Sequence, residues 1–317
     1  MGRTYSVNGY LNAALRRSGK TLLVEGPGDK ALLHRLIAER LPNFSPLSNI
    51  DHAGMVEDPL LAGSGNKSRV VTVRDSVDIL ASHSPKIASK LGTLTDREWD
   101  GLAIDDYSPQ PEWHPPVQCE RHFTTLGHSI ENYNFDYGCI KEYIKFHFAE
   151  FATENVFVAL EKGIPATLVL AAVLSIKLKN ESQLSRSNGL IDLPHIREGN
   201  ERIYLDASFS AACTTRGISC AETIVLDVNQ GVDAAWEALH RSHSTKWIPH
   251  GHIGNDVLWV GAAYIALRNG FPRELAAELA KGGRKQRDLF QAQWLSKEPA
   301  SKREPLDATL DWLNQAA

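Results

Sequence analysis

The sequence is poor in cysteine and has no excess of basic residues. Only 4 of the 317 residues are cysteine, and no two of them form a C-x-x-C pair. Cysteines this sparse do not build a disulfide framework in a chain of this length, and they suit a reducing compartment. With 34 Lys and Arg against 38 Asp and Glu, the net charge of -4 excludes a protein that coats nucleic acid through bulk charge. We therefore expect a cytoplasmic protein.

Long apolar runs are also missing. The most apolar stretch, residues 164–176, is flanked by Glu161 and Lys162 on one side and by Lys177 and Lys179 on the other. This stretch is shorter than the roughly 20 apolar residues that span a bilayer. The start of the chain has no continuous apolar segment of the kind found in secretory signals. We expect no membrane association.

Glycine-rich phosphate loops are absent from the sequence as well. Ala31 stands where a dinucleotide-binding fingerprint needs its third glycine after Gly26 and Gly28. Residues 61–68 lack the glycines of a phosphate loop and precede an apolar run where they should follow one. A regulated step driven by ATP would therefore need another chain.

The residues that are present predict a globular α/β protein. Hydrophobic residues make up 43% and charged residues 23% of the chain, which is typical of a folded protein with one large or two ordinary domains. Apolar runs at residues 21–24, 70–73, 91–95 and 123–126 predict strands, and helical spacing of apolar residues follows the first of them at 29–40. This alternation predicts a mostly parallel sheet flanked by helices.

The pattern changes beyond residue 135. Aromatic and aliphatic residues there recur at spacings of three and four, which predicts helices. The segments with this pattern are residues 140–161, 165–179, 234–241, 257–267 and 273–291. We expect loops at 180–200. The chain would thus form an α/β catalytic domain over residues 1–135 and a mainly helical domain over 136–317 that contacts the substrate or a partner.

Two acidic residues surround the turn after the first predicted strand. Glu25 directly follows the apolar residues 22–24, and Asp29 begins the predicted helix. Open α/β sheets bind ligands at the carboxyl ends of their strands, and hard carboxylate oxygens suit Mg²⁺ or Mn²⁺. The structural alternative makes Asp29 a helix cap and Glu25 an exposed turn residue.

A second acidic group follows the predicted strand 91–95. Asp96 and Glu98 are two residues apart, so in an extended segment their side chains point to the same side. They would join Glu25 at a metal centre, and Asp100 is a further acid nearby. Taken alone, this segment is better explained as a charged turn after a weak strand; taken together with Glu25, it is better explained as part of a metal centre.

These motifs resemble the Toprim fold of topoisomerases, primases and nucleases of the OLD family. The resemblance rests on Glu25 with Gly26, on Asp29, and on the acidic pair Asp96 and Glu98. The segment 128–135, HSIENYNF, is similar to the Ser-Ile-Glu-Asn-Tyr signature of a Toprim subgroup found in anti-phage defence. That subgroup includes the AriB-like effectors of PARIS systems, which pair with an AriA-like ABC-type ATPase. By motif the resemblance covers residues 20–135.

The resemblance implies a role for each matching acid. Glu25, Asp96 and Glu98 would be catalytic, although the family pattern has Asp where this chain has Glu98. The implied metal ligands are Glu25, Asp29, Asp96, Glu98, Asp100 and Glu131. One or two Mg²⁺ or Mn²⁺ ions held by such acids can activate water for phosphodiester cleavage.

The resemblance also implies a substrate and a partner. The chain would be a nuclease effector that an ATPase subunit holds inactive, and that cuts host RNA, tRNA in particular, once it is released. The residues expected to contact substrate are Lys141, Lys177, Lys179, His252, Arg284 and Lys285. No spacing distinguishes RNA from DNA, so an OLD-type DNA nuclease and a non-catalytic Toprim-like binding subunit remain alternatives. The free effector could form a homodimer.

Overall fold

The chain divides into two compact units. The computed structural model describes residues 4–40, 49–105, 108–109, 113–281 and 284–315. Unit 1 comprises Met1–Arg97, Pro115–Leu126 and Ala292–Ala317, and unit 2 comprises Glu98–His114 and Gly127–Gln291. This division differs from the boundary predicted after residue 135, because the chain leaves unit 1 and returns to it twice.

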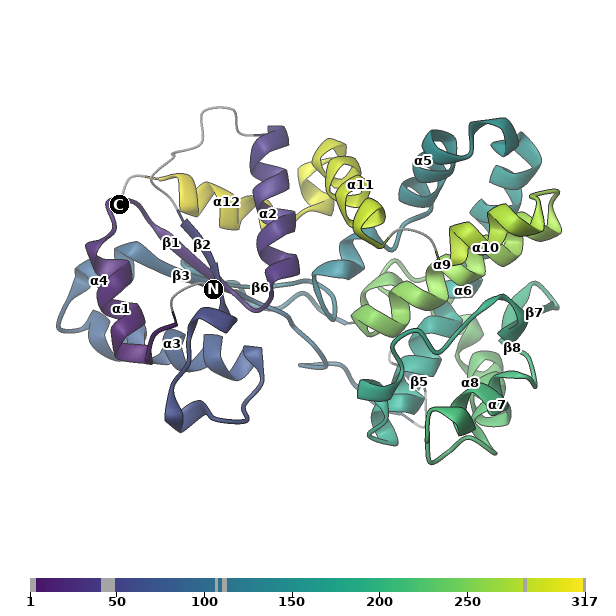
Figure 1. The fold of residues 1–317 in the computed structure, drawn as a ribbon, viewed down its shortest axis with the longest axis horizontal. Helices are drawn as coiled ribbons and strands as arrows, with labels where there is room; N and C mark the ends of the chain where they lie inside the picture. Colours follow the sequence, from purple (N-terminus) through teal and green to yellow (C-terminus); the bar gives the residue numbers. More distant parts are fainter. Residues whose placement is uncertain (1–3, 41–48, 106–107, 110–112, 282–283, 316–317) are drawn as a thin grey trace. The chain divides into compact units, whose positions relative to one another are not determined.

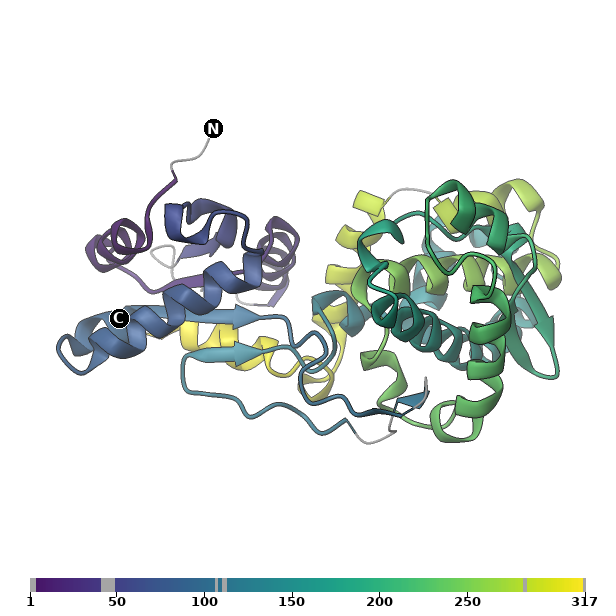
Figure 2. The same ribbon diagram turned by 90° about the horizontal axis from the view of Figure 1, so that it is seen from below.

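Unit 1 is built on a four-stranded, all-parallel sheet (Figures 1 and 2). The strands lie in the order β2–β1–β3–β6, with bounds Asn49–His52, Thr21–Val24, Leu91–Thr95 and His122–Thr124. In the central pairs, Val24 lies opposite both His52 and Leu94. Strand β1 is buried along its whole length, as expected of a central strand covered on both faces. The predicted α/β class and parallel sheet are confirmed.

Helices cover both faces of this sheet. The helices α1 (Val7–Arg16), α3 (Asn66–Ala81) and α4 (Pro85–Lys90) share a hydrophobic cluster with Leu23 of β1. On the other face α2 (Pro27–Arg40) contacts α12 (Leu306–Asn314), and a Cβ on Gly92 of β3 would lie 2.8 Å from the ring of Trp312. Three short 3-10 helices complete the unit: η1 (Ala53–Met55), η2 (Pro59–Leu61) and η8 (Ala300–Lys302).

Polar contacts also bind the end of the chain to unit 1. The buried amine of Lys20 donates to the carbonyl of Trp312 at 3.0 Å, and its ammonium lies 4.6 Å from the centre of that indole ring. Arg303 and Asp307 form a buried ion pair at 3.0 Å. The last residues of the chain therefore complete the α/β unit, which periodicity alone did not reveal.

Unit 2 is mainly helical and packs around α6. Its helices are α5 (Tyr137–His147), α6 (Glu154–Asn180), α7 (Phe209–Thr215), α8 (Ile224–Leu239), α9 (Gly251–Arg268), α10 (Arg273–Lys281) and the first half of α11 (Arg284–Lys297). Two antiparallel pairs, β4 (Ile104–Asp105) with β5 (Ser108–Pro109) and β7 (Ile196–Gly199) with β8 (Arg202–Leu205), lie beside them. The 3-10 helices are η3 (Ile130–Asn134), η4 (Ala149–Phe151), η5 (Leu184–Arg186), η6 (Leu193–His195) and η7 (Thr245–Trp247).

Helix α6 is the central core element of unit 2. It is long and apolar enough to cross a membrane by length and composition, but 67% of its most apolar window is buried inside the protein. It packs against α8 and α9, and Gly261 of α9 allows a close approach, since a Cβ there would lie 2.3 Å from Cγ2 of Thr167 in α6. Helix α6 is therefore packed as a core helix of unit 2.

Several sequence-based element assignments need correction. The strand predicted at 70–73 is part of helix α3, because Val70, Val73 and Val77 share one buried helical face. Strand β2 was missed, since its sequence NIDH contains a single aliphatic residue. Helix α6 runs through Pro165, so the helices predicted at 140–161 and 165–179 are instead α5 and α6. The strands predicted at 21–24 and 91–95 are confirmed.

Candidate active site

Glu25 and Asp96 meet at the carboxyl edge of the parallel sheet in unit 1. Strands β1 and β3 are neighbours in register, and each ends directly before one of these acids. The backbone N–H of Asp96 donates to Oε1 of Glu25 at 2.8 Å. Two residues that are 71 positions apart in the sequence are thus in contact through the Asp96 backbone. We call this end of the sheet, with Glu25 and Asp96, the acidic edge.

This edge is also where the connections of the sheet diverge. From β1 the chain runs to β2 on one side, and from β3 it runs to β6 on the other side. Loops that leave neighbouring parallel strands in opposite directions open a crevice, and α/β proteins bind ligands at such switch points. Glu25 and Asp96, both half-buried, are the acids that follow the two strands at this point.

Asp29 caps the helix that follows β1. Its Oδ2 accepts the backbone N–H of Gly26 at 2.7 Å, three residues before it. This is half of a capping box, with the carboxylate in the first turn of α2 where the helix dipole favours a negative charge. Asp29 therefore caps the helix, as the structural alternative in the sequence analysis states. One N–H occupies only part of a carboxylate, which has two oxygens and about four acceptor positions.

The donors at this edge suit a partly hydrated magnesium ion and do not form a cage of many acids. Among the described residues, no group of three or more His, Cys, Asp or Glu side chains has an arrangement that could hold a metal ion. Mg²⁺ typically binds through one or two carboxylates and keeps several waters or substrate oxygens. Glu25 and Asp96 offer these two carboxylates at one edge, so the residues present suit a single, partly hydrated ion.

Sequence reasoning missed two cations beside these acids. Arg97 is buried: its N–H donates to Oγ1 of Thr125 at 2.9 Å, and its guanidinium donates to the carbonyl of Leu126 at 3.1 Å. The amine of Lys67, at the start of α3, donates to the carbonyl of Arg97 at 3.3 Å. Lys67 thus contacts the residue that follows Asp96, whereas Lys141, which was expected to contact substrate, belongs to unit 2.

The other three predicted ligands belong to unit 2. Glu98 has a left-handed backbone with φ of 55°, and its N–H donates to the carbonyl of His128 at 2.7 Å. The carbonyl of Asp100 accepts the indole N–H of Trp113 at 3.0 Å. Left-handed conformations are uncommon for residues with a Cβ, so the turn at Glu98 is held in place by its surroundings. Glu131 lies in η3.

The motif HSIENYNF is largely a structural clamp within unit 2. Oδ1 of Asn132 accepts from the backbone and hydroxyl of Ser129, and its amide donates to the carbonyls of Lys246 and Pro249 at 2.8 and 3.0 Å. Tyr133 packs edge-on against Trp247, with ring centres 5.0 Å apart. Asn132 and Tyr133 therefore hold η3 against the segment that enters α9.

Ser129 and Glu131 of this motif both face the start of α9. A Cβ on Gly251 would lie 2.4 Å from Oγ of Ser129 and 2.9 Å from Oε2 of Glu131, so glycine at this position leaves room for both side chains. The ring of His250 lies 4.5 Å from that of His128 and 6.0 Å from that of His252. Burial lowers the pKa of His250 to about 4, helped by His252 and opposed by Glu131, so His250 is neutral at physiological pH.

The residues expected to contact substrate differ in their accessibility. Lys177 is only 4% exposed and pairs with Asp227 at 2.7 Å and Glu181 at 3.0 Å, which explains its charge without a substrate. Lys141 lies over the rings of Tyr137 and Phe157, Lys179 lies over Trp99, and His252 is exposed. Helix α11 begins at Arg284 and includes Lys285, whose side chains lie outside the described part of the chain.

Comparison with known proteins adds no family. No family model matches the chain, and no curated protein matches it.

Proposed function

We propose that the chain is a divalent-metal-dependent nuclease whose active centre is the edge formed by Glu25 and Asp96. The observation that carries this proposal is the hydrogen bond from the Asp96 N–H to Glu25 at the switch point between β1 and β3. The Toprim-like sequence motifs give the same two residues a catalytic role. Both lines of reasoning therefore identify one location.

Each residue at this edge has a task in the proposed chemistry. When bound, a Mg²⁺ or Mn²⁺ ion supplies Lewis-acid stabilisation of the scissile phosphate. Glu25 and Asp96 hold the ion, and the Asp96 N–H orients the Glu25 carboxylate. Lys67 is a candidate to neutralise charge on the phosphate, because its amine lies 3.3 Å from the backbone carbonyl of Arg97, the residue after Asp96.

The biological setting of this nuclease follows from the same resemblance. We propose a cytoplasmic effector of anti-phage defence that an AriA-like ATPase releases to cut tRNA. The low cysteine content and the absence of a phosphate loop in the sequence support the compartment and the need for a second chain. Copurification of an ATPase encoded by the adjacent gene tests the partner, and its repeated absence would contradict this part.

One observation favours a second candidate function. No described group of three acids could hold a metal, and Glu25 and Asp29 each accept a backbone N–H. A non-catalytic Toprim-like subunit, in which these carboxylates only stabilise turns, would show the same contacts.

Cleavage assays with matched variants separate the candidates. Purified protein is incubated with Mg²⁺ and end-labelled tRNA, unstructured RNA or duplex DNA. We expect tRNA cleavage that Glu25→Gln and Asp96→Asn each reduce about a hundredfold or more, because even outer residues of metal sites are worth 10–100-fold. Glu39→Gln on α2, which removes a surface pair with Arg35, is the control. Preferred cleavage of DNA would favour the OLD-type alternative, and full activity of both acidic-edge variants would refute a catalytic role.

A further inference from the structure

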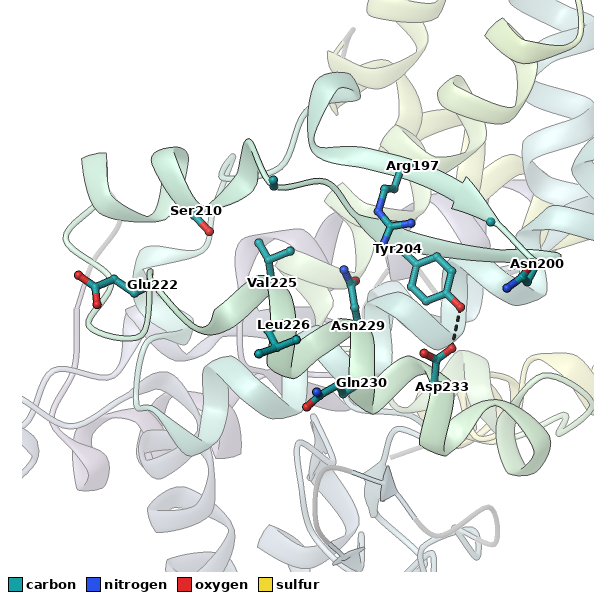
Figure 3. Close-up of a pocket in the computed structure, with 12 residues that line it drawn as sticks. Arg197, Asn200, Tyr204, Ser210, Glu222, Val225, Leu226, Asn229, Gln230 and Asp233 are labelled. Atoms are coloured by element: carbon teal, nitrogen blue, oxygen red, sulfur yellow. Dashed lines mark hydrogen bonds between the residues drawn. The ribbon is translucent and has the colours of Figure 1, made fainter.

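A pocket in unit 2 has the features of a small-ligand site unrelated to the acidic edge. It lies between the β7–β8 hairpin and helices α7 and α8, and has a volume of about 570 Å³ (Figure 3). Pockets of roughly 300–1,000 Å³ are the usual size for small-molecule sites. Its lining is mostly polar and includes Arg197 and Glu222, with the apolar side chains of Val225 and Leu226 among them.

The neighbours of Arg197 in this pocket fix the orientation of its guanidinium group. Arg197 and Tyr204 are directly opposite one another across the hairpin, and the guanidinium lies 4.8 Å from the centre of the Tyr204 ring. The hydroxyl of Tyr204 donates to Asp233 at 2.6 Å, which fixes the ring. Stacking on a fixed aromatic ring orients a guanidinium without neutralising it.

Neighbouring acids do not neutralise this charge. In the described parts of the chain, Arg197 forms no ion pair, and Asp233 instead pairs with Arg202. Asp206 forms no ion pair with Arg197 among the described residues; the pKa of Asp206 is lowered by the N–H of Ser208, which donates to its Oδ1 at 2.9 Å, and to a smaller extent by the charge of Arg197. Arg197 can therefore donate to an incoming carboxylate, and the planar guanidinium suits this acceptor.

The rest of the lining defines the body and the far end of the ligand. Figure 3 shows Val225 and Leu226 between Glu222 on one side and Arg197, with Tyr204 and Asn200 of the β7–β8 hairpin, on the other; the Glu222 carboxylate extends away from Val225. Leu226 is 61% exposed, a high value for a leucine that lines a pocket. Asn229 is fixed because its amide pairs with both backbone groups of Leu205 at 2.9 and 3.0 Å. The pocket lining is thus apolar at Val225 and Leu226, held by Asn229, and carries Arg197 on one side and Glu222 on the other.

We infer that this pocket binds an amphipathic zwitterion. Its carboxylate pairs with Arg197, its apolar chain covers Val225 and Leu226, and its ammonium group lies toward Glu222. Free ω-amino acids and short peptides with free termini share this chemistry. The inference does not depend on the nuclease proposal, since every residue involved belongs to unit 2 and lies outside the acidic edge.

Titration calorimetry with defined probes tests the inference on the full-length protein. The probes are ω-aminooctanoate, octanoate, octylamine, and trileucine with free or with blocked termini. We expect ω-aminooctanoate or free trileucine to bind most tightly, and whichever is tighter identifies the source as a small molecule or a peptide. Arg197→Gln should weaken binding about tenfold, the equivalent of one charge-assisted hydrogen bond. Arg273→Gln, at an exposed arginine outside the pocket, should leave affinity unchanged.

A second variant protects the test against misfolding. Leu226→Ala removes an exposed side chain, so it should leave the melting temperature unchanged while weakening every octyl probe several-fold. The inference is overturned if no probe binds saturably, if octylamine or blocked trileucine binds as tightly as its zwitterionic counterpart, or if folded Arg197→Gln protein keeps wild-type affinity.

Discussion

Replacement of Asn132 should reveal how strongly the clamp stabilises unit 2. The side chain is fully buried and takes part in four hydrogen bonds, with lengths of 2.8 to 3.2 Å, to Ser129, Lys246 and Pro249. At about 1 kcal/mol for each bond, Asn132→Ala should lower the free energy of unfolding by about 3–4 kcal/mol. That is a large share of the roughly 5–15 kcal/mol by which domains are stable.

Asn134 in the same 3-10 helix provides a matched control. It is also buried, but its amide makes one long hydrogen bond, 3.4 Å to Gln291. Asn134→Ala should therefore cost about 1 kcal/mol. Both values come from urea denaturation followed by far-ultraviolet circular dichroism, with linear extrapolation to water. Equal losses for the two alanine variants would refute the argument that the hydrogen bonds of Asn132 hold η3 in place.

The isosteric variant Asn132→Asp adds a pH test of the same clamp. An ionised aspartate cannot donate to the carbonyls of Lys246 and Pro249, so the buried site favours its protonated form and raises its folded-state pKa. A raised pKa means that the folded state binds more protons than the unfolded state. The stability deficit against wild type should therefore grow as pH rises above about 4. A deficit that stays constant with pH would show that the carbonyls do not control the site.

Three further predictions concern packing, charge and capping. Gly261→Ala should lower the free energy of unfolding by about 2 kcal/mol, because its Cβ would overlap Thr167, whose hydroxyl donates to the carbonyl of Gly163. In Gly163→Ala the new Cβ meets only the flexible end of Ile265, so this variant should be nearly neutral. The melting temperatures of the two variants test both expectations. Lys177→Met should cost about 2 kcal/mol in urea denaturation. The hydrogen bond to Lys177 lowers the pKa of Asp227, so the stabilisation is present above about pH 4 and lost as pH falls through the lowered pKa. The stability of Lys177→Met should therefore fall less steeply in acid than that of the wild type. An unchanged fall would contradict this linkage. Asp29→Asn keeps an acceptor for the Gly26 N–H and should be as stable as the wild type, whereas Asp29→Ala should lower the free energy of unfolding by about 1 kcal/mol. Equal melting temperatures for the two variants would argue against capping.

The sequence was most informative where one local pattern determines both structure and chemistry. The apolar runs before Glu25 and Asp96 are short, fully buried strands, and neighbouring parallel strands bring their carboxyl ends together. The spacing of apolar residues also predicted most helices of unit 2. Where the pattern was ambiguous, as in the three valines and one threonine of 70–73, the longer helical face decided the outcome.

The contacts that sequence reasoning missed are long-range and polar. Nothing local indicates that Lys20 binds the carbonyl of Trp312, 292 positions away, so the return of the chain to unit 1 was not predictable. Lys67 was hidden for the same reason, since its contact with the residue after Asp96 depends on where α3 begins. The Asn132 clamp likewise joins segments more than a hundred residues apart.

Binding of Mn²⁺, measured by electron paramagnetic resonance, tests the central claim most directly. The account predicts one saturable Mn²⁺ site that Glu25→Gln and Asp96→Asn each weaken at least about tenfold, while Glu39→Gln leaves it intact. Wild-type affinity in both acidic-edge variants, or no saturable site in the wild-type protein, would contradict it.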